Sequence, residues 1–170
     1  MARPSSVRAI VRSRPVARIA APVLRPILRR FSLEQIARSR VLSAAVRAPI
    51  ATPWFTIRAP GGERLVLSST FAPHLYWAGL PAFEPDLVPS FLARIASARR
   101  FVDVGANFGF YSILAAVTNP TAAIYAVEPN PALAALLKET AARNGVTLAV
   151  HELALSDRGG AASLSLRGGL

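Results

Sequence analysis

The chain of 170 residues contains no cysteine, one methionine and only two histidines, His74 and His151. Without cysteine it has no disulfide framework, no thiolate zinc site and no cysteine nucleophile. The carboxylates form no cluster with the spacing of metal ligands, so no metal site is predicted. Neither histidine has a recognisable partner in the sequence, and we interpret both as ordinary residues.

Acidic residues are almost missing from the first 50 positions, where eleven arginines face Glu34 alone and the net charge is +10. Residues 51–170 hold nine basic and eight acidic groups, so the overall charge of +11 belongs to the start of the chain. We expect a basic leader over residues 1–50, partly disordered or in short helices, because its prolines interrupt longer ones. A solvated segment is the simplest interpretation; weak contact with anionic surfaces and organellar targeting are the alternatives.

Long hydrophobic runs are also missing, since no stretch reaches the roughly 20 apolar residues of a membrane-spanning helix. No transmembrane segment is expected, and we expect a cytoplasmic location. Apolar residues still make up 52% of the chain, which excludes a disordered protein. Aromatic residues do not interleave with the later basic ones, so no specific nucleic-acid partner is expected.

Between the leader and residue 100, the sequence predicts a small β element and a helical lead-in, which together form the segment 51–100. Residues 54–58 and 64–68 are rich in β-forming side chains and flank a Pro-Gly-Gly turn, the pattern of a hairpin. Apolar positions at helical spacing follow Asp86 and predict a helix before residue 100.

From residue 101 onward, apolar strands alternate with helical patterns. The expected elements are a strand at 101–105, a helix ending before Asn119-Pro120, a strand at 124–127, a helix between Asn130 and Asn144-Gly145, a strand at 146–155 and a short β segment at 161–166. Strands joined by crossover helices predict an α/β fold with a parallel sheet and right-handed connections.

The first of these strands runs into a turn in which Asp103, Gly105, Asn107 and Gly109 alternate as D-x-G-x-N-x-G. Glycine allows positive φ and lets a ligand approach the backbone. The next apolar strand ends at Glu128, whose carboxylate suits two neighbouring hydroxyl donors. This layout is typical of a nucleoside-cofactor site. A dinucleotide site would have its glycines spaced as G-x-G-x-x-G instead.

Four ordered blocks extend this pattern. They are Phe83-Glu84-Pro85, the segment from Val102 to Ser112, Ala126-Val-Glu-Pro-Asn-Pro131, and Ala154-Leu-Ser-Asp157 with Gly159. Together they resemble the FkbM family of S-adenosylmethionine-dependent methyltransferases. The resemblance implies a Rossmann-like class I methyltransferase fold, a parallel sheet with flanking helices. Residues 101–170 match only its first half, so the domain is expected to be truncated after the third strand.

The resemblance also implies S-adenosyl-L-methionine as cofactor, bound by Asp103, Gly105, Ala106, Asn107, Gly109 and Glu128. The turn would lie against the amino-acid and ribose portions, Asp103 would orient the turn and the cofactor ammonium, and Glu128 would accept from the ribose hydroxyls. The nearest alternatives are a capping role for Asp103 and a solvated strand end for Glu128. Glu84 matches a block but has no derivable role.

Members of the family are associated with O-methylation, which implies a hydroxyl acceptor on a sugar, glycan or natural product. No catalytic residue can be assigned. A non-catalytic remnant with a basic surface-binding tail is one alternative function, and a dinucleotide-dependent oxidoreductase is another. Because the first strand of this fold normally has neighbours on both sides, we also expect self-association through an exposed sheet edge.

Overall fold

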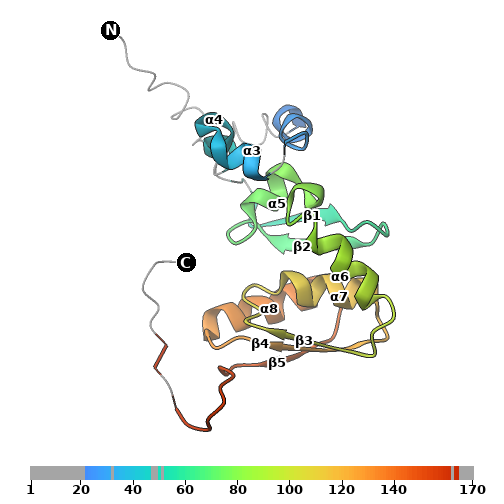
Figure 1. The fold of residues 1–170 in the computed structure, drawn as a ribbon, viewed down its shortest axis with the longest axis vertical. Coiled ribbons are helices and arrows are strands. Elements are labelled where there is room, and N and C mark those ends of the chain that lie inside the picture. Colours follow the sequence, from blue (N-terminus) through green and yellow to red (C-terminus); the bar gives the residue numbers. More distant parts are fainter. Residues whose placement is uncertain (1–21, 32, 47–49, 51, 162, 165–170) are drawn as a thin grey trace. The chain divides into compact units, whose positions relative to one another are not determined.

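The structure is a computed structural model that describes residues 22–31, 33–46, 50, 52–161, 163 and 164. The chain divides into a first unit, residues 1–93, and a second unit, residues 94–170. Figure 1 labels the helices and strands of both units.

The first unit combines short helices with an antiparallel hairpin. A helix covers residues 22–28. The other elements are α3 (Leu33–Arg38), α4 (Arg40–Val46), β1 (Trp54–Arg58), β2 (Arg64–Ser68), α5 (Pro73–Ala78), the 3-10 turn η1 (Leu80–Ala82) and α6 (Leu87–Ile95), which runs into the second unit. Trp54 pairs with Ser68 and Arg58 with Arg64, which confirms the predicted hairpin.

The described part of the basic leader belongs to the folded core of the first unit. Leu28 and Ile36, from the leader helices, are buried together with Trp77 and Ala78 of α5. The Arg25 guanidinium lies 4.7 Å from the centre of the Tyr76 ring, a cation–π contact. Residues 22–31 and 33–46 are therefore a structural part of this unit; residues 1–21 lie outside the described residues.

The second unit is a parallel βαβαβ arrangement, as the alternating pattern predicts. Its elements are β3 (Arg100–Val104), α7 (Phe110–Thr118), β4 (Ala123–Val127), α8 (Pro131–Asn144) and β5 (Ala149–His151). The strand order is β3-β4-β5, and both pairs are parallel. The α/β class with a preceding hairpin is confirmed. The third strand is shorter than the predicted 146–155, and the described residues of 161–166 form no strand.

Local sequence signals set both ends of α8. The Asn130 side chain accepts a hydrogen bond from Ala132 N at 3.0 Å, and Pro131 occupies the first helical position, where its missing N–H costs nothing. Gly145 ends the helix with φ 65°, the left-handed conformation that glycine adopts without strain. These caps fix where the chain leaves β4 and re-enters the sheet at β5.

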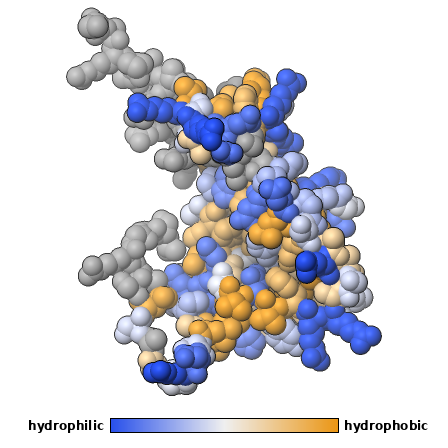
Figure 2. Space-filling model, viewed as in Figure 1, coloured by the Kyte–Doolittle hydropathy of each residue, from blue (hydrophilic) through white to orange (hydrophobic). Residues whose placement is uncertain are grey.

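The two faces of the sheet differ. Helices α7 and α8 contact one face, as Figure 1 shows, and bury Ala126 of β4 and Leu137 of α8. On the other face Val102 and Val104 are more than half exposed, and Tyr125 is also exposed. Figure 2 shows apolar side chains on the surface of this unit. Since β3 has only β4 as a neighbour among the described strands, self-association through its free edge stays a prediction.

The described residues contain neither a membrane-spanning helix nor a cluster of metal ligands. None of their helices is long and apolar enough to cross a bilayer. No group of three or more of their His, Asp or Glu side chains is placed to hold a metal ion.

The packing of the leader predicts a stability effect. Leu28→Ala removes a side chain that is 1% exposed, and we expect the free energy of unfolding of the first unit to fall by about 2–5 kcal/mol. Ile27→Ala, at a neighbouring position that is 47% exposed, should cost less than about 1 kcal/mol. Urea titrations followed by tryptophan fluorescence measure both values, because Trp54 and Trp77 lie in this unit. Equal losses in the two variants would contradict the packing.

Asn119 provides a matching test in the second unit, where it joins the end of α6 to the loop before β4. Its amide nitrogen donates to the carbonyls of Ile95 and Ala98, both at 2.9 Å, and its oxygen accepts from Thr121. Asn119→Ala removes these hydrogen bonds, of which the one to Ile95 O is buried, and should cost about 1–3 kcal/mol.

The control for this variant is Asn144→Ala, which removes a side chain that donates to Thr140 O from a half-exposed position. It should cost less than about 1 kcal/mol. Hydrogen exchange of the β3 and β4 amides in increasing urea gives both values for this unit alone. If Asn144→Ala lowered the free energy of unfolding as much as Asn119→Ala, the hydrogen bonds of Asn119 would have no particular importance for stability.

Candidate cofactor site

The turn after β3 adopts the backbone that its sequence predicts. Gly105, Asn107 and Gly109 have positive φ values of 74°, 54° and 85°. Asparagine is among the few other residues that enter this region readily, so its place between the glycines has a conformational cause. The three left-handed positions turn the chain from the end of β3 into the start of α7.

Both glycines of this turn have positive φ, and they differ in what surrounds them. A Cβ on Gly109 would lie 2.6 Å from Cγ of Leu137, so glycine here lets α7 and α8 pack closely. A Cβ on Gly105 would meet nothing within 4 Å. Gly105 therefore leaves its backbone open to an approaching molecule, and Gly109 serves the packing of the domain.

Glu128 ties the two loops of the site together. Its Oε2 accepts a hydrogen bond from Asn107 N at 2.8 Å, and its Oε1 accepts from Asn130 N at 2.9 Å. The residue is only 6% exposed. Hydrogen bonds to an ionised acceptor are stronger than neutral ones, so this carboxylate holds the β3–α7 turn against the β4–α8 turn. It is more than a solvated strand end.

Further backbone bonds support the same junction. Gly105 N and Ala106 N donate to Val127 O at 2.9 and 3.0 Å. Ala106 is buried with Ala126 and Leu137, so its side chain belongs to the core. Its contribution to a ligand site would come from its backbone.

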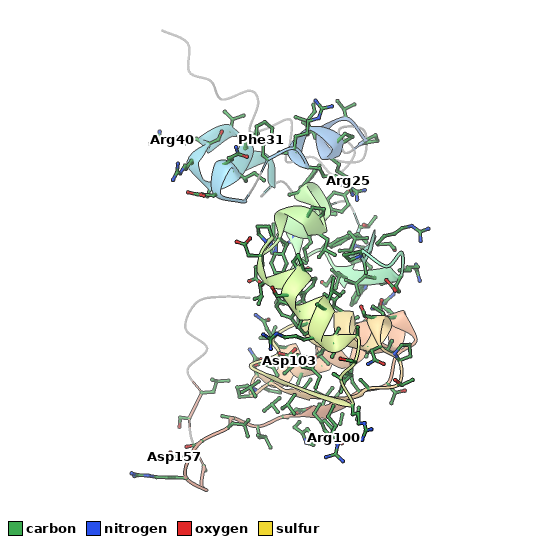
Figure 3. All side chains as sticks on the ribbon, turned by 45° about the vertical axis from the view of Figure 1, so that its right-hand side comes forward. Arg25, Phe31, Arg40, Arg100, Asp103 and Asp157 are labelled. Carbon is green, nitrogen blue, oxygen red and sulfur yellow. The ribbon has the colours of Figure 1, made fainter. Side chains whose placement is uncertain are left out.

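Asp103 lies on the face of β3 that α7 covers. Ser112 Oγ of α7 donates to Asp103 Oδ2 at 2.6 Å. Burial raises the pKa of Asp103 above its ordinary value of 3.8, and hydrogen bonds from Ser112 act in the opposite direction. Figure 3 shows Asp103 and Arg100 toward opposite ends of this strand. Asp103 is thus anchored to the helix that follows the turn.

Ser112 is the functional candidate that the sequence reasoning did not single out. It is fully buried in a helix whose neighbouring residues Ile113 and Leu114 are apolar. A buried hydroxyl needs a hydrogen-bond partner. A serine within an apolar stretch of helix is therefore the sequence signal that could have indicated a bond between Ser112 and Asp103.

Five of the six predicted site residues meet at the carboxyl ends of β3 and β4: Asp103, Gly105, Ala106, Asn107 and Glu128. The sixth, Gly109, begins α7 and packs against Leu137. Asp157 does not join them. It is exposed and contacts Ser156 and Arg158, and Figure 3 shows it apart from Asp103.

The remaining block, Phe83-Glu84-Pro85, lies in the first unit and contains a strained backbone. Glu84 has φ 43°, although a residue before proline normally adopts an extended backbone. The carbonyl of Glu84 accepts from Leu87 N and Val88 N, both at 3.0 Å, and so starts α6. Phe83 stacks on His74 with ring centres 5.0 Å apart, and burial lowers the pKa of His74.

Comparisons with known proteins give little beyond this geometry. No protein-family model matches the chain, and no curated protein matches it. Among solved structures, the chain is similar to PH0793 from Pyrococcus horikoshii, a protein named only provisionally as a transferase, with a TM-score of 0.40 and 19% identity. The match covers 63% of this chain and 38% of that chain. This similarity says nothing about the ligand or the reaction of the present chain.

The Glu128 tie predicts a loss of stability in the absence of any ligand. Glu128→Gln replaces one acceptor oxygen by a donor that opposes a backbone N–H, and should lower the free energy of unfolding of the second unit by about 1–3 kcal/mol. Glu152→Gln is the matched control. It weakens only a surface ion pair with Lys138 and should cost less than about 1 kcal/mol. Hydrogen exchange in increasing urea measures the free energy of unfolding of both variants. Equal losses would mean that the hydrogen bonds of Glu128 contribute little to stability.

Proposed function

We propose that residues 101–170 bind S-adenosyl-L-methionine and form part of a methyltransferase that acts on a hydroxyl group. The observation that carries the proposal is the pair of hydrogen bonds from two successive βα loops to Glu128. They hold an acid beside a turn in which the space next to Gly105 is open. In open parallel α/β sheets, ligands bind beyond the carboxyl ends of the strands, which is where these residues lie.

Glu128 would hold the ribose. Each of its carboxylate oxygens already accepts one backbone N–H, and an ionised carboxylate offers about four acceptor positions in all. The remaining positions suit two neighbouring hydroxyl groups. The backbone tie would keep the carboxylate in one orientation before the ligand arrives, which lowers the entropic cost of binding.

Asp103 would face the ammonium group of the methionine portion, with Ser112 as its positioning residue. A positive charge stabilises the ionised carboxylate and opposes the effect of burial on the pKa of Asp103. The open backbone at Gly105 would let this portion of the ligand lie close to the turn. The cofactor itself supplies an activated methyl group when bound, so the task of these residues is to bind and orient it.

A dinucleotide is the second candidate ligand, because an acid that ends the second strand suits either ribose. Calorimetric titration of the full chain separates the two. We expect S-adenosylmethionine and S-adenosylhomocysteine to bind, NAD to bind at least tenfold more weakly, and Glu128→Gln to reduce the affinity by about 1–3 kcal/mol. Glu152→Gln should bind normally. Binding of NAD without a response to either sulfur compound would overturn the proposal.

The raised pKa of Asp103 leads to a prediction of how the affinity for S-adenosylmethionine depends on pH. Its folded pKa is raised above 3.8, and the bound ammonium favours the ionised form, so binding should release a proton. The affinity for S-adenosylmethionine should therefore rise as the pH increases from about 4 through the raised pKa, and level off above it. In Asp103→Asn this rise should disappear. A rise of the same size in the variant would assign it to another group.

The stability of the ligand-free chain should change in the opposite direction over the same pH range. A raised pKa means that the folded state binds the proton more tightly than the unfolded state. The stability of the wild-type chain relative to Asp103→Asn should fall as the pH rises through that range. Thermal melts of the two chains at several pH values measure this difference.

A further inference from the structure

A groove in the first unit has no part in the candidate cofactor site. It has a volume of about 410 Å³ and lies along β1, beside the segment that follows α5. A second pocket of about 370 Å³ adjoins it and shares Arg58, Leu80 and Pro81 as lining residues. Both volumes fall within the range of about 300–1,000 Å³ that is usual for small-molecule sites.

The first pocket is positively charged. Arg29, from the leader, and Arg58, at the end of β1, both line it, and none of the described residues that line either pocket is acidic. Arg58 also pairs across the hairpin with Arg64. Like charges directly opposite each other are unfavourable in an antiparallel pair, and a bound anion would offset that repulsion.

Each of the two arginines lies beside a backbone feature of the first unit. Arg58 Nη1 donates to Gly62 O at 2.8 Å, within the hairpin turn. Arg29 lies against Gly79, where a Cβ would be only 3.1 Å from Arg29 Nε. The absence of a side chain at Gly79 therefore makes room for Arg29 at the pocket wall. A planar guanidinium group suits a carboxylate or a phosphate, because its N–H groups match the spacing of two oxygens.

The second pocket is apolar. Four of its seven lining residues are prolines, at positions 60, 81, 85 and 89, and Leu80 and Val88 add aliphatic surface. Proline has no N–H, so this wall offers few donors to a polar ligand. An apolar chain could lie here without leaving polar groups unpaired.

We propose that this groove binds a single-chain anionic amphiphile. Its carboxylate or phosphate head lies between Arg29 and Arg58, and its apolar chain follows Leu80 and Pro81 into the proline-lined pocket. The two adjoining compartments, one cationic and one apolar, carry the inference. It does not depend on the proposed methyltransferase function, because all of its residues lie in the first unit.

Calorimetry of the full chain with dodecyl phosphate and with dodecanoate, each below its micelle-forming concentration, tests the site. The double variant Arg29→Gln/Arg58→Gln should bind at least roughly 10-fold more weakly, since each lost charged hydrogen bond is worth about that factor. Arg40→Gln is the control for the loss of an arginine outside the groove. Arg40 is exposed on α4, lines neither pocket and projects outward in Figure 3.

A second variant tests the groove without changing its charge. Thr56 is exposed on β1 and lines the first pocket, and tryptophan is well accepted in strands, so Thr56→Trp should fill the groove and abolish binding. The relative affinities of dodecyl phosphate and dodecanoate identify the preferred head group. Dodecanol, which lacks the charge, should bind at least tenfold more weakly than either.

Several outcomes would overturn the proposal. They are a failure of both anions to bind the wild-type chain, equal affinities in the double variant and Arg40→Gln, and dodecanol binding as tightly as the anions. Undiminished binding in Thr56→Trp would place the amphiphile elsewhere on the chain and would overturn it as well.

Discussion

The carboxylate of Glu128 accepts hydrogen bonds from the backbone of two different loops, and the relative position of those loops brings the candidate site together. The carboxylate fixes Asn107 beside the end of β4 and Asn130 at the start of α8. The bonds from Gly105 and Ala106 to Val127 act at the same junction and shorten the distance that the carboxylate has to bridge. A single buried acid therefore has a structural role and, under our proposal, a binding role.

The architecture of the second unit could be predicted because its signals are local. Asn130, Pro131 and Gly145 mark the ends of α8 by their own backbone preferences, and the carboxyl ends of neighbouring parallel strands must meet. The partners of the site residues were not predictable in the same way. The bond between Ser112 and Asp103, and the contact between Gly109 and Leu137, depend on how α7 and α8 pack, which no local pattern specifies.

In the leader, the amino-acid composition gave little indication of how the segment packs. Arginines dominate residues 1–50 and favour the interpretation of a solvated segment. The described part nevertheless buries Leu28 and Ile36 against Trp77, and Arg25 lies over Tyr76. Long cationic side chains can lie along apolar surface while their neighbours enter a core, so net charge is a poor guide to whether a segment folds.

The order of the strands in the second unit also affects how the chain can acquire its structure during synthesis. Arg100 pairs with Ala123 and Tyr125 pairs with Ala149, so each strand joins the one that immediately precedes it in the sequence. Contacts of this kind close modest loops and favour rapid assembly. The contacts among β3, α7 and β4, and both hydrogen bonds of Glu128, join residues that are synthesised before β5. The nascent chain therefore holds Asn107 and its carboxylate partner Glu128 before β5 has been made.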